Sequence, residues 1–240
     1  MKINDVDINY VRYGNNKKDT IVLLHGWGQN IDMMRPLGNY LEDDYSILII
    51  DLPGFGESTE PTYAWSLDDY VESVRKIIEK EKIKNPIVMG HSFGGKLAIL
   101  YASKYEVKKL VLFAPPINHN HKVSMKSKVL KSIKKLPMMD KIGEKMKKHM
   151  GSTDYRNASP IMREILVNHV NTDIYDKLDD IKASTLIIWG EQDMAVNPSV
   201  AYEIESKIKD SGVVMLPGTH YAYLENLNRV VSIIESFLEG

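Results

Sequence analysis

One serine lies in a pattern that can make its hydroxyl a nucleophile. Ser92 is the centre of a Gly-x-Ser-x-Gly motif that follows a short apolar run and precedes a segment rich in Ala and Leu. This order predicts a buried strand, a very tight turn with Ser92 at its tip, and a helix that begins at the serine. Gly90 and Gly94 lack side chains, so the strand and the helix can approach each other closely. The free N–H groups of the first helical turn would then face any anion formed at Ser92.

A serine hydroxyl also needs a base that takes its proton and a third group that orients the base. Of the seven histidines, His220 is the candidate base, because it lies in a loop directly after the last predicted strand. Asp193 is the candidate orienting acid, since it follows the preceding strand, and Glu191 is the alternative. The chain order Ser92, Asp193, His220 is the one expected for a catalytic triad on alternating strands and helices.

Five other histidines are predicted to have roles outside the triad. His91 adjoins the nucleophile and is predicted to be structural, and His25 is predicted to be packed and hydrogen-bonded. His119, His121 and His149 fall in a helical segment, where a solvated surface is the expectation and contact with substrate is the alternative.

A tetrahedral oxyanion at Ser92 requires hydrogen-bond donors of its own. The backbone N–H of Phe93 comes with the turn, and the N–H of Trp27 is the natural second donor, just after His25-Gly26. Loss of one such donor typically lowers turnover by about 10²–10³-fold.

The elements that position these residues alternate between strands and helices. Residues 2–13 predict an antiparallel hairpin at a sheet edge, and Ser66 to Asp69 resembles a capping box at the start of a helix. The alternation predicts an α/β fold, with a mostly parallel central sheet and helices on both faces. Besides the strand before Ser92, buried strands are predicted at residues 20–24 and 45–50, and further strands at residues 107–114, 185–189 and 213–216.

Residues 117–182 interrupt this alternation. They show helical periodicity and no strand pattern, so we predict an all-helical lid inserted into a core made of residues 1–116 and 183–240. Ligands bind at the carboxyl ends of the strands in open α/β sheets, which is where such a lid would lie. The predicted substrate-pocket residues are Trp27, Met125, Val129, Met139, Ile142, Met146 and Met194.

The lid segment differs in composition from the rest of the chain. Residues 117–164 carry a net charge of +8 against −9 elsewhere, and they hold six of the twelve methionines. Flexible thioether side chains repack around varied apolar ligands, so we expect a small apolar acyl ester as substrate. The alternative is that the methionines only attach the lid to the core and the lysines form a solvated face. The positive charge could steer an acidic partner or an anionic substrate to the site.

Whole-chain composition excludes several other classes of protein. The 240 residues are 43% hydrophobic and 26% charged, values typical of a globular protein, and the net charge of −1 favours neither nucleic acid nor membrane as a partner. The absence of cysteine excludes disulfides, thiolate catalysis and cysteine metal sites. We expect no metal and no cofactor. No apolar leader and no transmembrane run is apparent, so the expected location is cytoplasmic.

Five loops give the chain a resemblance to the α/β-hydrolase superfamily over its full length, which implies that fold and a nucleophile elbow at Ser92. The first two loops resemble those of the pimeloyl-acyl carrier protein methyl ester esterases and related small carboxylesterases, which implies an acidic acyl carrier protein as a possible partner. The loops are His25-Gly26-Trp27-Gly28, Asp51 to Ser58, Gly90 to Gly95, Gly190-Glu191-Gln192-Asp193 and Gly218-Thr219-His220.

The leading functional hypothesis is a serine esterase or thioesterase that works through an acyl-enzyme on Ser92 without a cofactor. A second hypothesis is a ligand-binding receptor of this fold that keeps a triad and turns over weakly. A third is cofactor-free perhydrolysis or C–C bond hydrolysis by the same triad. The fold alone does not separate these functions.

Overall fold

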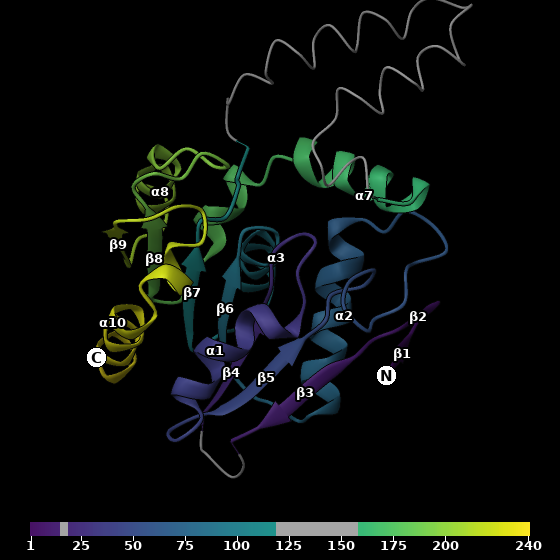
Figure 1. The fold of residues 1–240 in the computed structure, drawn as a ribbon, viewed down its shortest axis with the longest axis horizontal. Helices are drawn as coiled ribbons and strands as arrows, with labels where there is room; N and C mark the ends of the chain where they lie inside the picture. The colour runs from purple at the N-terminus through teal and green to yellow at the C-terminus, as the bar shows by residue number, and fades with distance from the viewer. Residues whose placement is uncertain (15–18, 119–157) are drawn as a thin grey trace, which may run out of the picture.

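A seven-stranded sheet lies at the centre of the computed structural model, which describes residues 1–14, 19–118 and 158–240 (Figure 1). Its strand order is β3-β5-β4-β6-β7-β8-β9. β3 (Tyr10–Tyr13) pairs antiparallel with β5 (Ser46–Ile50), and the other neighbouring pairs are parallel. This confirms the predicted mostly parallel α/β sheet. The other strands are β4 (Thr20–Leu24), β6 (Ile87–His91), β7 (Lys109–Phe113), β8 (Thr185–Gly190) and β9 (Ser211–Leu216).

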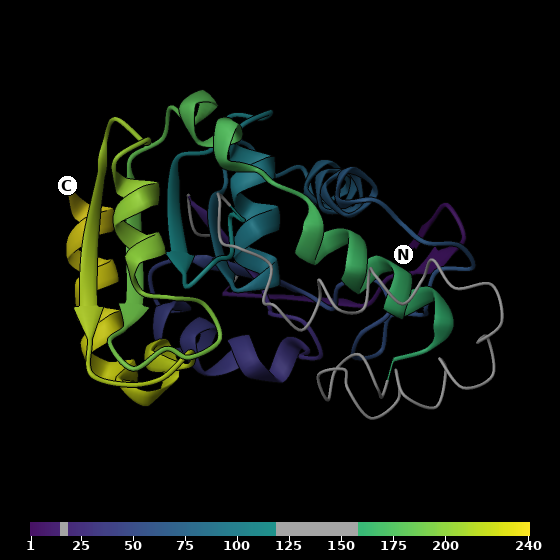
Figure 2. The ribbon, with the colours of Figure 1, turned by 90° about the horizontal axis from the view of Figure 1, so that it is seen from above.

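Helices cover both faces of the sheet, as the continuous apolar strands predict. In β4, Ile21 and Leu23 belong to one apolar cluster, and Val22 and Leu24 belong to the other. Figure 2 shows α1 and α2 on opposite sides of the strands. No helix in the described ranges is long and apolar enough to cross a membrane. Helices α1 (Ile31–Leu41) and α10 (Leu227–Glu239) pack on one face, and α2 (Leu67–Lys80), α3 (Phe93–Ala102) and α8 (Ser199–Glu205) pack on the other.

The amino-terminal residues differ from the predicted single hairpin. β1 (Lys2–Ile3) and β2 (Val6–Asp7) pair with each other in a separate two-stranded sheet, and only β3 joins the main sheet. The buried side chains of β1 and β2 pack in the same apolar cluster as α2. The predicted antiparallel hairpin is present, but its predicted place at the edge of the main sheet is wrong, because this short hairpin buries its apolar face against helical side chains rather than extending the edge strand.

Between β7 and β8, the described residues form α7 (Pro160–Asn171) and the 3₁₀ helix η1 (Tyr175–Asp180). Ser159 caps α7 by accepting a hydrogen bond from the Met162 N–H at 3.1 Å. Helix α7 lies at the edge of the sheet where the parallel strands end (Figure 1). The division into core and lid stays a prediction. The predicted pocket residues Met125, Val129, Met139, Ile142 and Met146, like His119, His121 and His149, lie outside the described residues.

Helix α3 approaches strands β4 and β6 so closely that only glycine fits at the contacts. A Cβ atom on Gly94 would lie 2.3 Å from the Leu24 carbonyl oxygen, and one on Gly90 would lie 2.4 Å from the Gly94 carbonyl oxygen. Both obstructing atoms belong to the backbone, so no side-chain rotation relieves the overlap. This close approach brings the first turn of α3 against the carboxyl end of β4.

Gly94→Ala is therefore expected to destabilise the fold by about 3 kcal/mol, at the upper end of the usual cost of overpacking. Gly212→Ala is the matched control, because a Cβ on this β9 residue meets no atom within 4 Å. It should change the free energy of unfolding by less than about 0.5 kcal/mol. Urea denaturation measures both variants, and equal stabilities would contradict the packing described here.

Candidate active site

Ser92 occupies the sharp turn between β6 and α3 in a backbone conformation that is strained for a residue with a side chain. Its φ is 50° and its ψ is −112°. The turn is held on both sides, because the Ser92 N–H donates to the Phe113 carbonyl at 2.8 Å and the Ser92 carbonyl accepts from the Lys96 N–H at 2.9 Å. Strain of this kind persists where the surroundings fix it, and it is concentrated at functional sites.

Asp193 and His220 lie together at the same edge of the sheet. His220 Nδ1 is 2.7 Å from Asp193 Oδ2, and the Asp193 side chain is fully buried. Burial alone would raise the pKa of Asp193, but hydrogen bonds from His220 and from the Ala195 and Val196 N–H groups hold the pKa below its usual value. An ionised Asp193 keeps the His220 proton on Nδ1 and leaves Nε2 able to accept one. The alternative acid, Glu191, is exposed.

His91 connects the nucleophile turn to the loop that carries His220. His91 is fully buried, and its Nε2 lies 2.9 Å from the His220 carbonyl oxygen. Because His91 directly precedes Ser92, this contact brings the His220 loop beside the turn. The structure describes no hydrogen bond between Ser92 Oγ and His220, and such bonds are often long before substrate binds.

The loop after β4 is fixed by buried polar contacts. The His25 ring bridges two segments, with Nδ1 donating to the Gly26 carbonyl at 2.8 Å and Nε2 accepting from the Leu52 N–H at 2.9 Å. The Gly26 N–H donates to Gln29 Oε1 at 2.9 Å. The predicted packed and hydrogen-bonded role of His25 is confirmed.

The Trp27 and Phe93 N–H groups are the predicted oxyanion donors. Within the described residues, neither group donates a hydrogen bond to another part of the chain. The two residues are neighbours, because their ring centroids lie 5.4 Å apart. One donor at the start of α3 and one in the loop after β4, both next to a serine, would form the arrangement that stabilises an oxyanion.

Aromatic rings surround these two donors. Phe55 packs edge-on against Trp27 at 4.9 Å, and His169 of α7 packs edge-on against Phe93 at 4.5 Å. Trp27, a predicted pocket residue, is therefore part of an aromatic wall. Met194, another predicted pocket residue, is not part of this wall, because it is 98% exposed. Asp193 turns inward to His220, and the next residue along the turn faces solvent.

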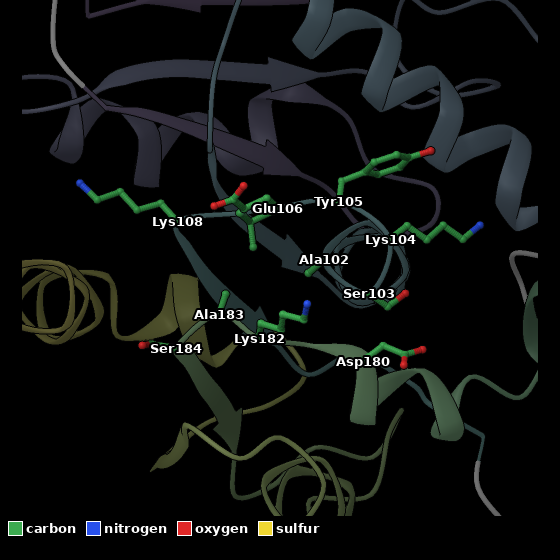
Figure 3. A pocket seen from close by; sticks show the side chains of 11 residues that line it. Ala102, Ser103, Lys104, Tyr105, Glu106, Lys108, Asp180, Lys182, Ala183 and Ser184 are labelled. Carbon is green, nitrogen blue, oxygen red and sulfur yellow. The ribbon is translucent and has the colours of Figure 1, made fainter.

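A polar hollow of about 540 Å³ lies elsewhere in the molecule, and Figure 3 shows the side chains that line it. It is lined by residues at the end of α3 and in the segments that precede β7 and β8, including Lys104, Lys108 and Lys182. Those are the amino ends of parallel strands, whereas Ser92, Asp193 and His220 follow carboxyl ends. Within the described ranges, no three His, Asp or Glu side chains converge as metal ligands would.

Three residues in these contacts were not singled out by the sequence analysis. Gln29 binds the Gly26 N–H, while Lys96 and His169 join α3 to α7. Lys96 carried a visible signal, because it is the one charged residue in a helix whose ten residues are otherwise apolar or glycine. Gln29 and His169 carried none, since their roles depend on contacts between distant segments.

The family model for the alpha/beta hydrolase fold matches residues 19–139, and the chain belongs to this family. The AB hydrolase superfamily protein YisY of Bacillus subtilis is 26% identical over 244 residues, with 90% of each chain covered. The human monoacylglycerol lipase ABHD6 is 24% identical over 254 residues, covering 92% of this chain and 75% of the lipase.

A solved structure extends the comparison to the whole fold. The crystal structure of a hydrolase from Pseudomonas aeruginosa PA01 matches with a TM-score of 0.80 at 18% identity, covering 100% of this chain and 97% of that one. At this level of identity the match concerns the fold alone.

Three buried histidines make stability depend on pH. Burial lowers the pKa of His25 to about 4, and it lowers the pKa values of His91 and His169 to about 3. Between these values and about 6.5 the unfolded chain binds protons that the folded chain does not. The three neutral histidines therefore contribute fully to the free energy of unfolding above pH 6.5, and this contribution is lost as the pH falls toward 4.

Each of these histidines is expected to remove about 3 kcal/mol of stability between pH 7 and pH 4. Urea denaturation at the two pH values measures the loss. His169→Phe keeps an aromatic ring without a titrating group, so the loss should be smaller in this variant by about one histidine's share. An identical loss in both proteins would contradict the assignment of a buried neutral imidazole.

Proposed function

We propose that this protein is a serine hydrolase that cleaves a carboxylic ester or thioester through an acyl-enzyme on Ser92. The observation that carries the proposal is the pairing of the buried Asp193 with His220, which the His91 contact brings to a strained serine turn. Chance does not readily produce an oriented imidazole and a strained serine at one sheet edge, each just past a different parallel strand.

The proposed chemistry uses groups already in place. Ser92 Oγ attacks the ester carbonyl while His220 Nε2 takes its proton, and the Trp27 and Phe93 N–H groups bind the oxyanion. The tetrahedral intermediate collapses as the His220 proton passes to the leaving alcohol or thiol. Water then attacks the acyl-enzyme with His220 again as the base, which releases the acid and restores Ser92. Asp193 stabilises the imidazolium formed in both halves.

The proposed substrate is an ester with an apolar acyl group. The aromatic wall of Trp27, Phe55, Phe93 and His169 supports it, and so does the similarity to a monoacylglycerol lipase. The narrower relation to esterases acting on an acyl carrier protein stays a prediction. It depends on the positive charge of residues 117–164, most of which lie outside the described residues.

Fluorophosphonate is expected to label Ser92 and no other residue, because an activated serine attacks its phosphorus. Peptide mass spectrometry locates the adduct. Ser92→Ala should abolish the label and leave the free energy of unfolding unchanged or raised, since it removes only a hydroxyl group from the turn. An adduct on a different serine would contradict the proposed nucleophile.

Asp193→Asn is expected to lower kcat by about 10⁴-fold, because the amide favours the His220 tautomer with its proton on Nε2. The amide oxygen can still accept from the Ala195 and Val196 N–H groups, so the fold should be retained. Glu191→Gln is the matched control and should change kcat by less than about twofold. Steady-state kinetics on p-nitrophenyl esters decide between the two acids, and a larger effect at Glu191 would reverse the assignment.

A panel of acyl p-nitrophenyl esters of increasing chain length separates the proposal from its alternatives. A receptor with a retained triad would bind ligands with negligible turnover. A perhydrolase would require hydrogen peroxide for its main product, and a C–C hydrolase would leave simple esters nearly untouched. Efficient ester turnover without peroxide is the result expected here.

A further inference from the structure

Lys96 is a buried cation with no part in the proposed chemistry. Its side chain is fully buried in α3, four residues after Ser92. Its ammonium donates to the His169 carbonyl at 2.8 Å and to the Thr172 carbonyl at 2.6 Å. No carboxylate lies within ion-pair distance of it in the described ranges. Burial lowers the pKa of Lys96 to about 8, and the negative charge of Asp173 opposes this shift.

The two acceptors identify what Lys96 holds. Both carbonyls belong to the carboxyl end of α7 and the residue that follows it. The last carbonyls of a helix have no partner within it and carry partial negative charge, so a cation placed there is favourable. Burying an ammonium costs several kcal/mol unless its hydrogen bonds are satisfied. Lys96 is therefore a fixed cap that joins the nucleophile helix α3 to α7.

The capped end of α7 carries the ring that lies beside the site. His169 packs edge-on against Phe93 at 4.5 Å, and its plane is within 5° of the Trp27 plane at 6.2 Å. Its Nδ1 is buried and has no hydrogen-bond partner among the described residues. The ring is thus not held in place through Nδ1. Its position depends on its packing against Phe93 and Trp27 and on the His169 backbone, which Lys96 binds directly.

The other end of α7 is held by different contacts. Met162 packs against Gly54, where a Cβ would lie 2.5 Å from the Met162 sulfur, and Ser159 Oγ bonds the Glu60 carboxylate at an exposed position. These contacts join α7 to the loop after β5, away from the nucleophile helix. The nucleophile helix instead meets the carboxyl end of α7, where the Lys96 ammonium binds the His169 carbonyl and the His169 ring packs on Phe93.

We propose that Lys96 is a positioning residue that fixes α7 as a wall of the acyl pocket and so determines which acyl groups the site accepts. The inference rests on the proposed esterase function and adds a determinant of specificity to it. The Lys96 ammonium holds the His169 backbone, the His169 ring closes the aromatic wall beside the oxyanion donors, and long apolar acyl chains bind against that wall. A short acyl group, such as acetyl, does not reach it.

The test compares p-nitrophenyl acetate with p-nitrophenyl octanoate. Lys96→Met keeps an unbranched apolar side chain and removes the cation. It should lower kcat/KM for octanoate by about tenfold, mainly through KM, because apolar pocket contacts contribute on that scale. For acetate the change should be less than about twofold. Lys104→Met is the matched control, since Lys104 lies just past the same helix and pairs with Asp68 at the surface, and it should change neither value.

Two further variants locate the effect. Lys96→Arg keeps a cation that can donate to both carbonyls, and it should restore the octanoate preference. His169→Ala should lose the preference as Lys96→Met does, and the double variant should lose no more than the worse single variant, because both act through one wall. Equal losses for the two esters in Lys96→Met, additive losses in the double variant, or a preference retained by His169→Ala would overturn the proposal.

Hydrogen exchange measured by mass spectrometry tests the cap without reference to activity. Peptides covering residues 160–172 should exchange faster in Lys96→Met than in the wild type, while peptides of α10 stay unchanged. If neither ester is hydrolysed by the wild type, the esterase proposal fails and exchange still decides whether Lys96 holds α7. Unchanged exchange in residues 160–172 would show that it does not. If Lys96→Met does not fold, the Arg and His169 variants decide the proposal.

Discussion

The site depends on the close approach of the nucleophile helix to two parallel strands. Gly94 lies against the carbonyl oxygens of Leu24 and His25, and Gly90 lies against the backbone of Gly94 and Gly95. Only at this distance can the chain turn through Ser92 with a positive φ and still continue the sheet and the helix. The same approach brings the start of α3, with Phe93, to the loop after β4, with Trp27, and these two residues carry the proposed oxyanion donors. The proposed nucleophile and the proposed oxyanion site thus depend on one packing constraint.

Polar side chains hold the loops of the site in place on this packed core. His25 joins the loops after β4 and β5, His91 joins the serine turn to the His220 loop, and Asp193 orients His220. Each connection lies in the interior, where a hydrogen bond is stronger than in water and an unpaired polar group is costly. The loops are therefore held by a few contacts that are costly to break. Burial lowers the pKa values of His25 and His91, so protonating either ring would destabilise these contacts.

The central fold could be predicted from the sequence. So could the placing of the segments that carry Ser92, Asp193 and His220 at one edge of the sheet. Continuous apolar strands, the glycines around Ser92 and the order of Ser92, Asp193 and His220 are local signals, and local signals can be read without coordinates. The amino-terminal hairpin was placed wrongly, because the partner of a short strand depends on tertiary contacts. The exposure of Met194 was not foreseen, because the direction of a turn residue depends on such contacts too. The contacts of Gln29, Lys96 and His169 escaped prediction for the same reason, since each joins segments that are distant along the chain.

The central claim is that an acyl group passes through Ser92, and trapping that group tests it most directly. Wild-type protein mixed with excess p-nitrophenyl octanoate and quenched in acid within the first turnover is digested and examined by mass spectrometry. The account predicts a burst of p-nitrophenol equal to the active enzyme and an octanoyl group on the peptide that contains Ser92. Steady release of p-nitrophenol with no acylated peptide, or with the acyl group on another residue, would contradict it.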